Sequence, residues 1–166
     1  RDQVRSLVPV FHELRALGVS LLPEATSSAR ERIIAYLRRY PMTLIEGDEL
    51  LVVSGIGEWA RRVRELRVQF GWWIYTGMTL RELAEENTEA AEDLAAALGL
   101  ALDAVRPDHY FLARADQDRD AAHRWNLLNT IRKQKLGVKA KILAYLRANV
   151  GTPVTLEELR YLCLLY

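Results

Sequence analysis

Four arginines lie close together in residues 58–69, and arginine can grip both guanine edges and phosphates of DNA. If this segment is helical, at about 100° per residue, one side is apolar and consists of Trp59, Val63, Leu66 and Phe70. The opposite side carries Arg61, Arg64, Glu65 and Val68, and Arg62 and Arg67 flank the apolar side. A helix that buries its apolar side and turns guanidinium groups outward fits a DNA major groove. A basic face that is merely solvated is the alternative.

An aromatic cluster follows at Trp72, Trp73 and Tyr75. Side chains alternate along a β-strand, so we expect one of the two tryptophans to be buried and the other exposed. Ordinary packing against neighbouring helices is one interpretation of these rings. The other is that the aromatic surface contacts a sugar or an extruded or modified base.

A basic stretch at residues 131–141 carries Lys133, Lys135, Lys139 and Lys141, which would contact phosphates without reading sequence or would only be solvated. We expect Arg61 and Arg64 near base edges and Arg62, Arg67 and the Lys135 region on phosphates. The predicted DNA-binding residues are Arg61, Arg62, Arg64, Glu65, Arg67, Trp73, Tyr75, Lys133, Lys135 and Lys139.

Catalytic constellations are missing from the sequence. His12, His109 and His123 are far apart, and none has metal-ligand spacing with Cys163, the single cysteine. Residues 116–120 begin like a calcium loop, but an alanine stands where glycine is needed and a leucine where the bidentate glutamate should be. We therefore expect no catalytic residue, no metal site and no cofactor in this chain.

The overall charge does not indicate a nucleic-acid-binding protein, because the 166 residues have a formal net charge of +1. Any basic surface for nucleic acid must therefore be local. Half of the residues are apolar, enough for one large core or two small ones. One cysteine excludes an internal disulfide, and no apolar run reaches the ~20 residues that span a bilayer. We expect a cytoplasmic protein without membrane contact, and the start at Arg1 without a signal pattern suggests an excised fragment.

The elements that would position the arginines can be read from periodicity. Apolar spacing predicts a leading helix over residues 2–18 that ends at Gly18, and then a linker over 23–28. From residue 29 we expect a helix, a short second helix, a glycine turn, the arginine helix and a β-segment, which is a helix-turn-helix followed by a wing. Residues 72–75 would pair with 109–114 as the strands of that wing.

Two further helical regions are expected. An inserted region over 79–105 would start at a capping box of Thr79 and Glu82 and break at Gly99. Its acidic face disfavours contact with phosphate. A connecting helix would span residues 118–134.

An internal repeat supports duplication of the helix-turn-helix. A shift of 109 positions aligns residues 33–55 with 142–164 without a gap and with eight identities. The identical pairs are Ile33/Ile142, Ala35/Ala144, Tyr36/Tyr145, Leu37/Leu146, Arg38/Arg147, Thr43/Thr152, Glu49/Glu158 and Leu50/Leu159. Thr155 and Glu158 form a capping box that would start the second helix of the second copy. That copy stops where the first enters its third helix, so we favour a truncated module over a degenerate packing element.

These patterns predict a mainly α fold with small β wings (α+β), built from tandem winged helix-turn-helix modules of which the second is truncated. Residues 1–28 would form the leading helix and linker. Residues 29–114 would form the first module with its insertion at 79–105. Residues 115–166 would form the connecting helix and the start of the second module.

Three blocks resemble the N-terminal region of bacterial HNH-type restriction endonucleases: residues 58–67 with 71–72, residues 118–126, and residues 146–151 with 157–161. The resemblance covers about residues 30–75 and 107–162. It implies winged-helix modules that precede a metal-dependent nuclease domain and restrict foreign or modified DNA. It carries a recognition role onto Arg61, Arg62, Arg64 and Arg67. The histidine-rich catalytic motif is absent from this sequence, so no catalytic residue is transferred, and a divalent metal is expected only of a downstream nuclease domain.

We therefore expect sequence- or modification-specific binding of double-stranded DNA by the targeting region of a restriction endonuclease whose nuclease domain is not in this chain. A stand-alone winged-helix transcription regulator is one alternative. A winged-helix protein-interaction module is another, because the net charge is nearly neutral. A homodimer is also allowed.

Overall fold

The computed structural model describes residues 1–22, 28–86 and 88–163. The chain divides into two compact units, Arg1–Gln117 and Asp118–Tyr166, and each has a hydrophobic core of its own. Helices with one small antiparallel sheet confirm the expected α+β class. Among the described residues, no helix combines the length and the apolar character that crossing a bilayer requires.

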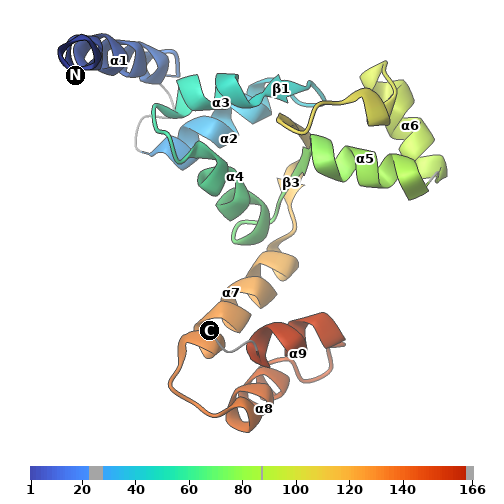
Figure 1. Cartoon of the computed structure of the whole chain (residues 1–166). Helices are drawn as coiled ribbons and strands as arrows, with labels where there is room; N and C mark the ends of the chain where they lie inside the picture. Colours follow the sequence, from blue (N-terminus) through green and yellow to red (C-terminus); the bar gives the residue numbers. More distant parts are fainter. Residues whose placement is uncertain (23–27, 87, 164–166) are drawn as a thin grey trace. The chain divides into compact units, whose positions relative to one another are not determined.

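The first unit begins with four helices (Figure 1). They are α1 (Asp2–Ser20), α2 (Ala29–Arg39), α3 (Gly47–Ser54) and α4 (Trp59–Val68). Ser28 caps α2, because its hydroxyl accepts a hydrogen bond from the Glu31 amide at 3.2 Å. Gly55 closes α3 in the left-handed conformation. The order of elements expected from residue 29 onward is therefore confirmed, while the predicted linker lies mostly outside the described residues.

A three-stranded antiparallel sheet in the order β1-β3-β2 completes the first core. Its strands are β1 (Ile45–Glu46), β2 (Trp72–Thr76) and β3 (His109–Gln117). The predicted pairing of residues 72–75 with 109–114 is confirmed, with Ile74 opposite Leu112. The two-residue strand β1 escaped prediction because it is too short to show a period. The core between helices and sheet contains Ile33, Leu37, Leu50, Val63, Leu66 and Ile74.

The chain between β2 and β3 forms an inserted helical region that consists of α5 (Gly77–Glu86), α6 (Glu89–Leu98) and the 3-10 helix η2 (Leu102–Ala104). The predicted start at Thr79 is wrong. The helix begins two residues earlier, because the Thr76 hydroxyl accepts the Thr79 amide at 3.2 Å and so satisfies a free donor of the first turn. The predicted end at Gly99 is confirmed, since this residue closes α6 with a φ of 69°.

The leading helix α1 is longer than expected. Gly18 does not end it, as predicted, but lies inside it and is buried against α3. A Cβ at this position would lie 2.2 Å from the Val52 carbonyl oxygen. Glycine is therefore required here for the close approach of two helices and not for a turn.

The second unit has three described helices, α7 (Arg119–Lys133), α8 (Val138–Ala148) and α9 (Leu156–Cys163). The predicted connecting helix is confirmed as α7, which Asp118 caps by accepting the Ala121 amide at 2.9 Å. The predicted capping box before α9 is confirmed, with hydrogen bonds from the Thr155 amide to Glu158 at 2.6 Å and from the Glu158 amide to the Thr155 hydroxyl at 3.2 Å.

The internal repeat extends to the structure. The bounds of α8 and α9 are those of α2 and α3 shifted by the same 109 positions. The Tyr36 hydroxyl donates to Glu49 at 2.5 Å, and Tyr145 donates to Glu158 at 3.0 Å. Burial and this hydrogen bond raise the pKa of each tyrosine to about 12. The two helix pairs therefore share their polar contact as well as their sequence.

Candidate nucleic-acid interface

The helix α4 is held with its apolar side toward the core, as the sequence predicted. Val63 and Leu66 are both 2% exposed. Trp59 meets the Tyr110 ring of β3 edge-on, with ring centroids 5.4 Å apart. Phe70, just after the helix, is half-buried beneath the Arg30 guanidinium at 4.4 Å. These contacts leave the remaining side of α4 for the arginines.

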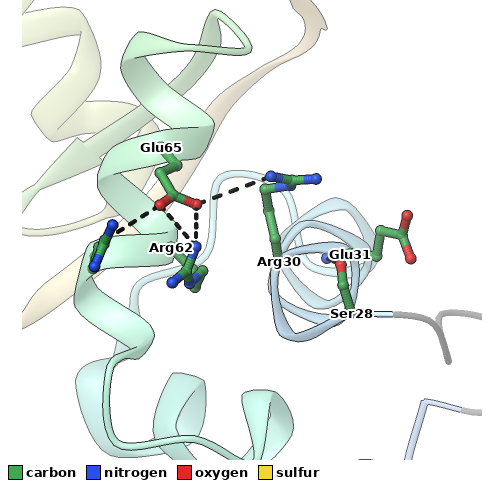
Figure 2. Close-up of polar contacts among 6 residues, drawn as sticks. Ser28, Arg30, Glu31, Arg62 and Glu65 are labelled. Carbon is green, nitrogen blue, oxygen red and sulfur yellow. Dashed lines mark hydrogen bonds and ion pairs between the residues drawn. The ribbon is translucent and has the colours of Figure 1, made fainter.

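Glu65 organises three of the arginines on this side (Figure 2). Its carboxylate lies 2.7 Å from Arg62, 3.4 Å from Arg61 and 3.9 Å from Arg30 of α2. Glu65 is only 13% exposed, while the Arg61 side chain is 68% exposed. Arg62 and Glu65 therefore form a partly buried pair within α4, whereas the longer contact between Arg30 and Glu65 joins α4 to α2. Arg61 keeps most of its surface in solvent, where an ion pair contributes little and exchanges readily.

Arg64 and Arg67 differ from Arg61 and Arg62, since neither takes part in an ion pair within the described part of the chain. Arg64 is exposed and Arg67 is half-buried. Burial raises the pKa of the Tyr110 phenol, and nearby Asp108 adds to this rise while Arg67 opposes it. The charge of Arg67 therefore acts on Tyr110 in the central strand β3.

The electrostatic character of the first unit is polarised. Helix α4 carries four arginines and one glutamate. Helices α5 and α6 together carry six acidic residues and one arginine, and that arginine, Arg81, donates to the Val105 carbonyl oxygen at 2.8 Å. A polyanion would therefore be attracted to α4 and repelled by the inserted helices.

The aromatic residues of β2 do not follow the expected alternation. Both Trp72 and Trp73 are half-buried, so the prediction that one is buried and the other exposed is wrong. The pairing register shifts between Trp72 and Ile74, which breaks the simple alternation of sides. Arg38 lies over the Trp72 ring at 5.7 Å, and Arg114 lies over the Trp73 ring at 5.1 Å.

Tyr75 also packs inside the unit. It meets the Phe111 ring edge-on at 5.4 Å in the second hydrophobic cluster, which joins the inserted helices to the sheet. This placement favours the packing interpretation for Tyr75. The Trp73 indole nitrogen is buried and has no hydrogen-bond partner among the described residues.

The predicted lysines belong to the second unit, at the end of α7 and the start of α8. Lys133, Lys135 and Lys139 are all exposed. Lys141 differs from them, since its ammonium donates to the Arg132 carbonyl oxygen at 2.7 Å. The three exposed lysines thus form a basic segment of the second unit.

Sequence reasoning missed three arginines outside α4 that contact Glu65 or the tryptophans of β2. Arg30 joins the Glu65 cluster from α2, and Arg38 and Arg114 stack on tryptophans. No local signal marks these residues, because each contact joins positions that are far apart in the chain. Within the part of the chain that the structure describes, no group of three or more His, Cys, Asp or Glu side chains could hold a metal ion.

No curated protein and no solved structure matches the chain. The family described as the KpnI N-terminal domain matches residues 30–113, just over half of the 166 residues. The matched region runs from α2 into β3 and includes α4 and the inserted helices. The match agrees with the resemblance to a restriction endonuclease N-terminal region, and the chain therefore belongs to the KpnI N-terminal domain family.

Proposed function

We propose that this chain binds double-stranded DNA by placing the solvent side of α4 in a major groove, as the targeting region of a restriction endonuclease. One observation carries the proposal: α4 is anchored by Trp59, Val63 and Leu66, while Arg64 stands in solvent without an ion pair among the described residues. A helix that is already held rigidly loses little backbone conformational entropy when it binds.

Each arginine of α4 has a different part in this proposal. Arg64 and Arg61 would reach base edges, where a bidentate arginine–guanine contact discriminates bases. Arg67, beside the sheet, would contact phosphate. Arg62 would stay paired with Glu65 along the helix, because their contact is short and partly shielded from water, and Glu65 would also link α4 to Arg30 of α2. Phosphate contacts would set the orientation of the helix and base contacts its specificity.

The architecture supports a winged-helix interpretation. Apart from the inserted helices, the elements follow the order α2, β1, α3, α4, β2 and β3 along the chain. In the sheet, β3 lies between β1 and β2. This is the order of a helix-turn-helix followed by a β-hairpin wing. The inserted helices would then take the place of the wing tip. The pair α8 and α9 would be a second helix-turn, and the exposed lysines at its start, Lys133, Lys135 and Lys139, would contact phosphates without sequence preference.

The activity served by this binding would be cleavage of DNA at a specific or modified site by an HNH-type nuclease domain. Its divalent metal would be held in that domain and not by the residues described above. A protein-interaction role is the main competitor, and salt dependence separates the two. Binding dominated by phosphates weakens steeply as salt rises, whereas binding to a protein partner does not require DNA affinity at low salt.

The proposal is tested by the double variant Arg64→Ala/Arg67→Ala, with affinity for a mixed-sequence DNA duplex measured by fluorescence anisotropy over a salt series. Loss of a bidentate base contact weakens binding by about 1–3 kcal/mol at the preferred site. Loss of one phosphate contact reduces the slope of log affinity against log salt by about 0.9. We expect both effects in the double variant.

The matched control is Arg5→Ala/Arg147→Ala, which removes the same charge from exposed residues outside α4. This control should bind nearly as well as the parent protein. A folded Arg64→Ala/Arg67→Ala protein with unchanged affinity and slope would remove α4 from the interface. Equal weakening in the control would show attraction by overall charge alone.

A further inference from the structure

The N-terminal part of α1 is an exposed helix with little cover from the rest of its unit. Residues 1–14 are all exposed, although α1 starts at Asp2. The close contacts with α3 lie farther on, where Arg15 donates to the Gly55 carbonyl oxygen and Gly18 lies against Val52. Figure 1 shows α1 extending beyond the group formed by α2, α3 and α4. A helical stretch of this length is marginal in water on its own, and it contains Pro9.

The exposed part of α1 is also strongly apolar on one side. Val4, Leu7, Phe11 and Leu14 follow one another at intervals of three, four and three residues, the spacing of a heptad seam. They are 68%, 63%, 53% and 55% exposed. These four residues are called the α1 seam below. Val8, Val10 and Leu17 flank the seam and are also exposed.

The other side of α1 has the opposite character. In the heptad set by the seam, the positions that point away from it are occupied by Asp2, Arg5, Ser6, Pro9, His12, Glu13 and Ala16. Pro9 is thus on the outer side, where its ring would not interfere with a partner helix. An apolar seam backed by polar residues is what a helix needs to pair with another helix.

The order of residues in the seam makes it complementary to itself. In an antiparallel pair, Val4 of one copy would face Leu14 of the other, and Leu7 would face Phe11, so each of the four layers is apolar. The same patch on both copies meets in this arrangement, as a two-fold symmetric dimer requires. A short groove beside the seam, lined by Phe11, Leu14, Val52 and Ile56 among others, extends the apolar surface onto α3.

The area of this surface is sufficient for a dimer. Complete burial of a Val- or Leu-sized side chain removes about 60–120 Å² of apolar surface. The seam and its flanking residues are about half to two-thirds exposed, so two copies would bury on the order of 500–1,000 Å² of apolar side chain. Stable interfaces bury about 1,200–2,000 Å² in total, of which somewhat more than half is non-polar.

We propose that two copies of this chain form a homodimer in which their α1 helices pair antiparallel through the α1 seam. The dimer does not depend on DNA binding, because the seam lies on α1 and outside the region that matches the KpnI N-terminal domain. It would place two α4 helices in one particle. The contact is short, and we expect a dissociation constant on the order of micromolar.

The test is sedimentation equilibrium of the full chain without DNA, over roughly 1–300 µM so as to bracket that constant. The variant Leu7→Glu/Leu14→Glu places charges in every layer of the proposed seam and should weaken dimerisation at least about tenfold. Both side chains are exposed and lie outside the core of α2–α4, so hydrogen exchange of that core should be unchanged.

The control Leu143→Glu/Leu146→Glu makes the same change on α8, where the two leucines are 47% and 43% exposed. Dimers of the parent chain and of this control, together with a monomeric Leu7→Glu/Leu14→Glu protein, would support the proposal. A parent chain that stays monomeric at the highest concentration would overturn it. So would a seam variant that dimerises as tightly as the parent, or a control that alone loses the dimer.

Discussion

Replacement of Leu37 by alanine is expected to lower the free energy of unfolding of the first unit by about 2–5 kcal/mol. Leu37 is 0% exposed and packs in the cluster that joins α2 to Val63 and Leu66 of α4 and to Leu112 of the sheet. Its neighbours belong to three elements that hold one another in place, so they cannot close the cavity. The same substitution should loosen α4, because α4 packs directly on α2.

The internal repeat supplies a matched control for this prediction. Leu146 occupies the position of Leu37 in the second copy but is 43% exposed. We expect Leu146→Ala to cost less than about 1 kcal/mol. Urea denaturation with hydrogen exchange followed separately in each unit would measure both effects, since the two units need not unfold together. Equal losses in the two variants would contradict the burial assigned to Leu37.

Substitution of Arg32 by methionine is expected to destabilise the first unit by about 3 kcal/mol, because hydrogen bonds from a charged donor contribute about 1.5–3 kcal/mol each. Arg32 is 8% exposed and donates to the carbonyl oxygens of Val53 at 3.1 Å and Ser54 at 2.6 Å. These carbonyls end α3, so the cation also faces the negative end of the helix dipole. Methionine keeps much of the apolar stem but leaves both acceptors without this donor.

Arg39→Met is the control for this substitution. Arg39 lies in the last turn of the same helix and is exposed, so its loss should change stability by no more than about 0.5 kcal/mol. Thermal unfolding of the two variants, with hydrogen exchange of α3 as the local probe, measures the difference. If Arg32→Met were as stable as Arg39→Met, Arg32 would not stabilise the turn between α3 and α4.

Much of the fold could be predicted from sequence because its strongest signals are periodic or repeated. The 109-residue shift located α8 and α9, and apolar spacing located α4 with Val63 and Leu66 inward. The pairing of β2 with β3 was also predicted across the inserted helices. These features depend on local pattern, which tertiary contacts then reinforce.

The errors have physical reasons at particular residues. Gly18 has the same sequence signature whether it ends a helix or lets two helices approach, and only the contact with Val52 decides. The half-burial of both Trp72 and Trp73 follows from a register shift that periodicity cannot show. Within the candidate site, charge alone could not separate Arg62, which is tied to Glu65, from Arg64, because that difference depends on side-chain geometry.

The exposure of the α1 seam is another feature that sequence periodicity could not predict. Its apolar spacing predicts a buried face, yet Val4, Leu7, Phe11 and Leu14 are all more than half exposed. An amphipathic pattern states that a face will be covered but not by what. In the dimer proposed above, a second copy of the chain covers this face.

The most direct test of DNA binding through α4 is an NMR titration of the isotope-labelled chain with a short mixed-sequence DNA duplex at low salt. We expect the largest shifts at the amides of α4 and at the Arg64 side chain, with α5 and α6 unaffected because their acidic surface repels phosphate. Unchanged α4 signals at saturating duplex, or shifts centred on another surface, would contradict the proposed interface.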